Sequence, residues 1–236
     1  KLYVPSASGK DSKGATIDFT QHVDVRDWAT LKALNEAYSG SLLTTGTLFK
    51  AAKAAGLTTA VLGKPAATFL QDMDVPSAFI DTDTAAPLSF VQELIDAGYA
   101  LPPLTPVMFP QITLPTGYVN PYAPVAPKLM KDGLTSDPTN PNSKPAQTKA
   151  YRYFVDQFVD FILPQKRPDL SFIWINEPDA TMHVYGPGSP QYKAALKEVD
   201  DMVGRIWDKV TALGLADTTD LIVTADHGAS TMSGPT

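Results

Sequence analysis

The fold is decided by one stretch of the chain, DLSFIWINEPDATMHVYGPG, which occupies residues 169–188. Its first part, 169–175, is an apolar run of the kind that forms a β-strand covered on both faces. A polar segment beginning at Asn176 follows directly, and the turn residues 186–188 close the stretch. In open parallel sheets, ligands bind beyond the carboxyl ends of the strands, so this junction is where we expect chemistry.

Helical patterns and short apolar runs alternate on either side of this stretch. Three of the expected helices end at a glycine, Gly56, Gly98 or Gly214, and the helix that ends at Gly98 has Ser89 as its expected N-cap. This alternation predicts right-handed crossovers and a mainly parallel sheet between two layers of helices, a three-layer α/β/α sandwich. The expected helices are 47–55, 87–98, 148–165 and 192–213, and the expected strands are 57–63, 77–80, 169–175 and 220–226.

Composition limits the classes of function. The chain has 236 residues, of which 44% are hydrophobic and 19% charged, so we expect one folded domain over 1–236. The net charge of −6 argues against binding to a nucleic-acid polymer. The sequence has no cysteine, which excludes disulfides and thiolate zinc sites, and no apolar run of about 18 residues that could span a membrane.

The segment 101–149 differs from the rest because prolines interrupt every helical pattern in it. We interpret it as a long excursion over the surface that serves as a cap or lid. The alternative is a structural insertion that never contacts a substrate.

Two strand ends carry paired aspartate and histidine residues. Asp179 and His183 follow the strand 169–175, and Asp226 and His227 end the strand 220–226. Carboxylate oxygen and neutral imidazole nitrogen are the ligands that zinc prefers when no thiolate is present. Because the carboxyl ends of parallel strands lie at the same edge of a sheet, we expect the two Asp/His pairs to lie close together there and to bind divalent metal ions. The third histidine, His22, lies in a polar stretch and is interpreted as a solvent-exposed imidazole.

These motifs together resemble one family. Glu177-Pro178-Asp179, His183, Gly186-Pro187, the Val199-Asp200 pair and Asp226-His227-Gly228 follow in the order and spacing of the type I phosphodiesterase/nucleotide pyrophosphatase branch of the alkaline phosphatase superfamily. The segment 47–64 is also similar to that family, so the resemblance covers about residues 41–232. It implies an alkaline-phosphatase-like fold.

The resemblance implies a hydrolase of small phosphate esters with two divalent ions, most often zinc. One ion would be held by Asp179 and His183, and the other by Asp226 and His227. It also implies an extracytoplasmic location, periplasmic or secreted, since members of the family are commonly exported.

The sequence departs from the family pattern at both ends. No strand ending in Asp-Gly and no recognisable nucleophile precede residue 47, and Thr44, Thr45 and Thr47 match a helix start better than the nucleophile motif. No histidine follows His227. We therefore expect a domain incomplete at both ends, with flanking segments of the same protein missing and a Thr or Ser nucleophile upstream of this chain. The chain alone should bind zinc weakly and be inactive.

Three further residues have two interpretations each. Glu177 either orients a metal ligand or caps the loop. Tyr185 either stacks on a substrate group or packs, and Lys64 either meets a phosphate or is solvated.

Competing functions follow from the same residues. A phosphomonoesterase or a phosphonate hydrolase would use the same ligands, because selectivity depends on the segments around the site. A non-catalytic pseudo-enzyme would keep the metal loops without a nucleophile. A structural α/β domain with surface Asp and His residues is the plainest alternative.

Overall fold

The computed structural model divides the chain into two compact units. One consists of Lys1–Ala123 with Arg167–Trp174, and the other of Pro124–Lys166 with Ile175–Thr236. The expectation of one domain over the whole chain stays a prediction. The structure describes residues 8–11, 13–21, 23–25, 27–74, 77–102, 105, 109–113 and 146–230.

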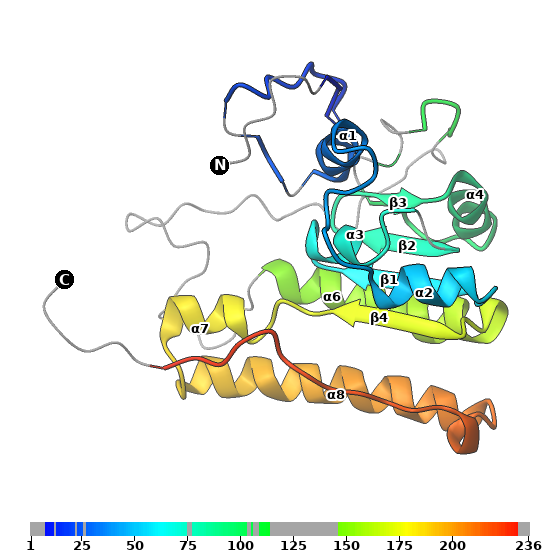
Figure 1. Ribbon diagram of the computed structural model, residues 1–236. Coiled ribbons are helices and arrows are strands. Elements are labelled where there is room, and N and C mark those ends of the chain that lie inside the picture. Colours follow the sequence, from blue (N-terminus) through cyan, green and yellow to red (C-terminus); the bar gives the residue numbers. More distant parts are fainter. Residues whose placement is uncertain are drawn as a thin grey trace, which may run out of the picture. The chain divides into compact units, whose positions relative to one another are not determined.

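The first unit is built on a four-stranded sheet with the order β3-β2-β1-β4 (Figure 1). β1 runs parallel to both of its neighbours, β2 and β4, and the short β3 pairs antiparallel with β2. Helices join these strands, which confirms the α/β class and the mainly parallel sheet. The strands are β1 (Thr59–Gly63), β2 (Ala78–Asp81), β3 (Ala85–Ala86) and β4 (Leu170–Trp174).

Four helices of the first unit enclose its apolar core. They are α1 (Trp28–Ala37), α2 (Leu48–Ala54), α3 (Ala67–Gln71) and α4 (Leu88–Asp96). Phe49 of α2 and Phe69 of α3 meet Val61 and Phe79 of the sheet in one buried cluster. The aromatic rings touch edge to face, with 6.2 Å between the centroids of Phe69 and Phe79. This geometry adds to the stabilisation from burial.

Gly63 is required where the parallel strands β1 and β4 end. It pairs with Trp174 of β4, and its φ is +127°. A Cβ atom at this position would lie 2.1 Å from the Trp174 carbonyl oxygen, which no side chain tolerates. The close approach lets the Lys64 N–H donate to the same carbonyl at 3.0 Å.

The second unit is helical in its described part. The long helix α8 (Pro190–Ala212) packs on α6 (Ala146–Gln157), on the π-helix η1 (Phe158–Lys166) and on α7 (Asp179–Tyr185). A short 3-10 turn, η2 (Ala216–Thr218), follows α8. The buried hydrophobic side chains of its described part come from α6, η1 and α8: Tyr151, Phe154, Val155, Phe158, Val159, Ile162, Leu163, Ala195, Met202, Ile206 and Val210.

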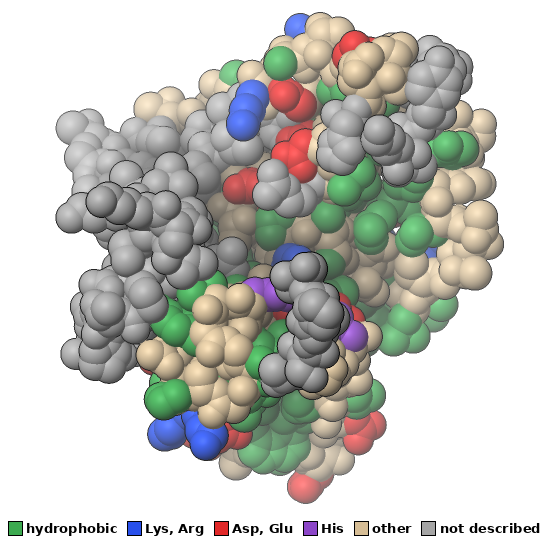
Figure 2. All heavy atoms as spheres, turned by 90° about the vertical axis from the view of Figure 1, so that its left-hand side faces the viewer, with side chains coloured by type: hydrophobic (Ala, Val, Ile, Leu, Met, Phe, Trp, Pro, Cys, Tyr) green, Lys and Arg blue, Asp and Glu red, His purple; other side chains and the backbone are tan. Residues whose placement is uncertain are grey.

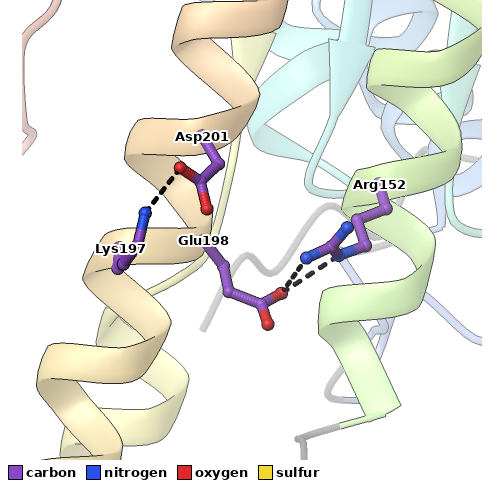
Figure 3. Close-up of polar contacts among 4 residues, drawn as sticks. All are labelled: Arg152, Lys197, Glu198 and Asp201. Carbon is purple, nitrogen blue, oxygen red and sulfur yellow. Dashed lines mark hydrogen bonds and ion pairs between the residues drawn. The ribbon is translucent and has the colours of Figure 1, made fainter.

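Ion pairs at the surface reinforce the packing of α8. Nε and Nη2 of Arg152 both donate to one carboxylate oxygen of Glu198, at 3.0 and 2.8 Å (Figure 3). Exposed pairs of this kind contribute less than about 1 kcal/mol each, so they orient the helices more than they hold them together. The other pairs between these elements are Arg205–Asp156 and Lys209–Asp160. Among the described residues, no helix is long and apolar enough to cross a membrane.

Most expected elements are present with small changes at their ends. The helix 148–165 forms and buries Tyr151, Phe154 and Phe158, but it changes from α-helix to π-helix at Phe158. The strand 169–175 forms as β4, yet four of its five residues are only half-buried and Ser171 is exposed, so the expected cover on both faces is wrong for the described residues. In α8 the buried stripe runs through Ala195 and Met202, whereas Leu196 is 47% exposed.

The expected strand 220–226 is wrong. Its residues adopt no regular secondary structure, and Ile222 and Val223 are 83% and 70% exposed. An apolar run indicates only that a segment can be buried, and it does not show that the segment pairs as a strand. A strand also needs a partner for its backbone N–H and C=O groups, and this segment pairs with no other strand in the described part of the chain.

The segment 101–149, interpreted as a cap, lies largely outside the described residues, and so does His22.

Helix starts separate two expectations that looked alike in sequence. Thr47 is the N-cap of α2, and its hydroxyl accepts the Lys50 N–H at 3.1 Å. Ser89, expected to cap the next helix, lies inside α4, whose N-cap is Pro87 with no side-chain bond. Pro87 has the extended backbone that an N-cap residue requires, with φ of −71° and ψ of 177°, and the helix begins at the next residue, Leu88.

We predict that Thr47→Ala lowers the free energy of unfolding by about 1 kcal/mol, since the Lys50 N–H loses its acceptor. Ser89→Ala is the matched control, and it should change stability by less than about 0.5 kcal/mol. Urea denaturation of both variants measures the difference. Equal effects of the two substitutions would contradict the assignment of Thr47 as a cap.

A buried carboxylate ends β2. Asp81 is 1% exposed, and its Oδ1 accepts hydrogen bonds from the backbone N–H groups of Asp83 and Thr84, at 2.8 and 2.7 Å. Burial raises the pKa of Asp81 to about 7, against the lowering effect of these bonds. The folded protein therefore retains a proton on Asp81 through mildly acidic pH, where the unfolded chain has lost it.

The sign of the resulting pH dependence follows from this raised pKa. The contribution of Asp81 to stability is complete below about pH 4 and is lost as the pH rises to about 7. We predict that Asp81→Asn gains about 3 kcal/mol relative to the wild type between pH 5 and pH 8, because asparagine is neutral throughout. Urea denaturation at both pH values measures it, with the exposed Asp74→Asn as control. A difference between Asp81→Asn and wild type that stays constant with pH would contradict the assignment.

Candidate metal centre

The helix α7 places Asp179 and His183 on one face. The polar segment that follows β4 forms a helix over Asp179–Tyr185. The buried carboxylate of Glu177 accepts the Thr181 N–H at 3.1 Å and satisfies a donor of the first turn. Gly186, with a φ of +84°, ends the helix. Residues four apart on a helix are neighbours, so Oδ1 of Asp179 lies 3.3 Å from Nε2 of His183.

His227 reaches the same carboxylate from the segment after η2. Its Nε2 lies 3.8 Å from Oδ1 of Asp179 and 3.8 Å from Oδ2 of Asp226. Its Nδ1 lies 2.8 Å from the carbonyl oxygen of Gly228. A carbonyl only accepts, so Nδ1 carries the proton, and Nε2 of the neutral ring is left with a lone pair.

The structure places Asp179 beside His183 and His227, and Asp226 beside its chain neighbour His227, although these contacts do not form where they were expected. They lie around α7 and an irregular segment, not at the ends of two neighbouring strands. His183 and His227 are open to solvent, with side chains 73% and 56% exposed, and histidine atoms are visible at the surface in Figure 2. Asp179 is less open, at 30%.

The atom at the centre of these contacts is buried. Oδ1 of Asp179 has no accessible surface and no hydrogen bond to any described residue. A buried carboxylate oxygen without a donor is unfavourable, and a cation is one way to satisfy it.

The donor set fits a divalent ion in chemistry and in pair distances. Ligands about 2.1 Å from a tetrahedral zinc ion lie about 3.4 Å from one another, close to the 3.3 and 3.8 Å found here. Within the described part of the chain, however, no three His, Asp or Glu side chains are already arranged around one point. Closure around an ion would need rotation of the exposed imidazoles.

A buried layer lies beneath this cluster. Burial raises the pKa of Glu177, and the neighbouring charges of Asp179 and Glu198 raise it further, against the bonds from Thr181. Burial also raises the pKa of Tyr151, whose hydroxyl is bonded to the backbone of Asn176. Tyr151 is not among the site residues expected from the sequence. The available signal was an aromatic residue with a hydroxyl on an otherwise apolar helix face.

The remaining candidates lie in different surroundings. Tyr185 is the last residue of α7 and is half-buried. Lys64 belongs to the first unit, where its ammonium lies 5.9 Å from the centre of the Trp174 ring, a cation–π contact. Neither interpretation of these two residues is decided by their contacts. Thr47 is occupied as a helix cap, which agrees with its match to a helix start.

The comparison with protein families accounts for the motifs. The model of the type I phosphodiesterase/nucleotide pyrophosphatase family matches residues 18–236, which is nearly the whole chain. The protein belongs to this family. The match begins before residue 41, where the motifs visible in sequence started.

Individual relatives share shorter segments with this chain. Ectonucleotide pyrophosphatase/phosphodiesterase family member 7 of Mus musculus is 36% identical over 83 residues, which cover 35% of this chain and 19% of the relative. The bis(5'-adenosyl)-triphosphatase enpp4 of Mus musculus is 39% identical over 74 residues, 30% of this chain and 16% of the relative. The venom phosphodiesterase of Naja atra is 38% identical over 68 residues, 29% of this chain and 8% of the relative.

The chain therefore spans less than a fifth of each of these relatives in alignment. No solved structure matches it significantly.

Proposed function

We propose that the protein is a metal-dependent hydrolase of phosphate esters, of the phosphodiester or nucleotide pyrophosphate type. Membership of the family supports the reaction class. The observation that carries the metal dependence is the buried, unbonded Oδ1 of Asp179 between the Nε2 atoms of His183 and His227.

Asp179, His183, Asp226 and His227 would hold the metal, which we propose to be two zinc ions. Bound zinc would supply Lewis-acid stabilisation of the charge on the phosphoryl group. The residues of this chain prepare that role. Asp179 provides the carboxylate that both imidazoles face. The hydrogen bond that Nδ1 of His227 donates to the Gly228 carbonyl presents Nε2 as the nitrogen that would bind the metal.

The substrate is proposed to be a small phosphate ester. Relatives are named as nucleotide pyrophosphatases, phosphodiesterases and a bis(5'-adenosyl)-triphosphatase, all of which cleave phosphoester or phosphoanhydride bonds. The net charge of −6 gives no support to a polymeric nucleic acid as the partner. The names of the ecto- and venom enzymes support an extracytoplasmic location.

The nucleophile is proposed to be a Thr or Ser outside this chain. Thr47 is not assigned this role, because its hydroxyl is the acceptor for the first turn of α2.

We predict that this chain binds zinc and that Asp179→Asn weakens binding at least about tenfold, since the shared carboxylate charge is lost. Isothermal titration with zinc measures the affinity. Asp208→Asn, an exposed aspartate on α8, is the matched control and should leave the affinity unchanged. In the complete enzyme, hydrolysis of a chromogenic phosphodiester should fall at least about a hundredfold in Asp179→Asn. Wild-type affinity in Asp179→Asn would contradict the proposed centre.

A further inference from the structure

Tyr151 ties the helix α6 to the turn that carries the metal-site residues. The side chain is 2% exposed, so its hydroxyl must find partners inside the protein. The backbone of Asn176 bonds to that hydroxyl. The two residues are far apart in sequence, so this contact depends on the tertiary structure.

The same turn is fixed by three more bonds. The Asn176 carbonyl accepts the Ala180 N–H at 3.1 Å, and the Pro178 carbonyl accepts the Met182 N–H at 2.8 Å. Oε2 of Glu177 accepts the Thr181 N–H. Asp179 lies between these bonded residues, so its backbone position follows from them.

Glu177 and Tyr151 belong to one buried polar layer. Glu177 is 5% exposed, and its second oxygen, Oε1, is buried without a hydrogen bond to any described residue. Both side chains bond to the backbone of the same turn, Glu177 at Thr181 and Tyr151 at Asn176.

The helix α6, which carries Tyr151, is itself fixed by packing against other helices. Phe154 and Val155 of α6 are fully buried, and Arg152 is bonded to Glu198 of α8 (Figure 3). α7 packs against the same helix α8. The turn at 176–181 is therefore tied to a packed helical layer and not to a loop.

We propose that Tyr151, together with Glu177, is a positioning residue of the metal centre: it fixes the 176–181 turn so that Asp179 faces both imidazoles before an ion binds. This role rests on the function proposed above. Outer residues of this kind change metal affinity without contacting the ion, by about 10- to 100-fold in other metal sites.

Three variants test the role. Tyr151→Phe removes the hydroxyl and keeps the ring, and Glu177→Gln removes the charge and keeps the shape. Val155→Ala is the matched control, because it removes buried atoms one turn further along the same helix but no polar group. Two measurements are made on each folded variant: amide hydrogen exchange without metal by NMR, and isothermal titration with zinc.

In Tyr151→Phe we expect the Asn176 amide to exchange at least about tenfold faster than in the wild type, since its acceptor is lost. In Glu177→Gln the Thr181 amide should exchange faster. Zinc affinity should fall about tenfold in both variants. In Val155→Ala the zinc affinity should stay within about twofold, although the protein is less stable.

The outcomes separate this role from the function on which it rests. Wild-type affinity and Asn176 exchange in Tyr151→Phe would overturn the positioning role while leaving the metal centre intact. Equal loss of affinity in Val155→Ala would show a general effect of stability and would also overturn it. A wild-type protein that binds no zinc would overturn the metal centre, and the role of Tyr151 with it.

Discussion

One carboxylate oxygen organises the candidate site. Oδ1 of Asp179 is withdrawn from solvent and faces two imidazole nitrogens, at 3.3 and 3.8 Å, yet no described residue donates a hydrogen bond to it. Burying an unsatisfied carboxylate oxygen is unfavourable. The surrounding structure must therefore compensate, and that constraint explains why bonded backbone surrounds Asp179 on both sides.

Both local and distant contacts stabilise the turn that carries Asp179. Within the turn, Glu177 and the carbonyl of Asn176 satisfy the first N–H groups of α7. From a distance, Tyr151 bonds to Asn176 across the interior of the second unit. The two imidazole neighbours of Asp179, His183 and His227, are solvent-exposed. A fixed carboxylate with exposed imidazoles beside it suits a site that a cation can reach from solvent.

Sequence predicted what depends on local chemistry. The helix capped by Thr47, the strand that leads to Asn176 and the pairing of Asp179 with His183 all follow from residue type and spacing. The family resemblance was confirmed for the same reason, since its motifs are short and contiguous.

The failures depended on partners far along the chain. The segment 220–226 has the composition of a buried strand, but composition cannot supply a neighbouring strand, and Ile222 remains exposed. The failure at Ser89 is local instead, because α4 begins at Leu88 and its N-cap is Pro87, two residues before Ser89. The bond between Tyr151 and Asn176 was not predicted, because nothing in the sequence connects the two residues.

Anomalous diffraction at the zinc edge, on crystals soaked in zinc, tests the central claim most directly. The account predicts a peak about 2.1 Å from Oδ1 of Asp179 and Nε2 of His183 or His227, and a peak elsewhere with none at Asp179 would contradict it.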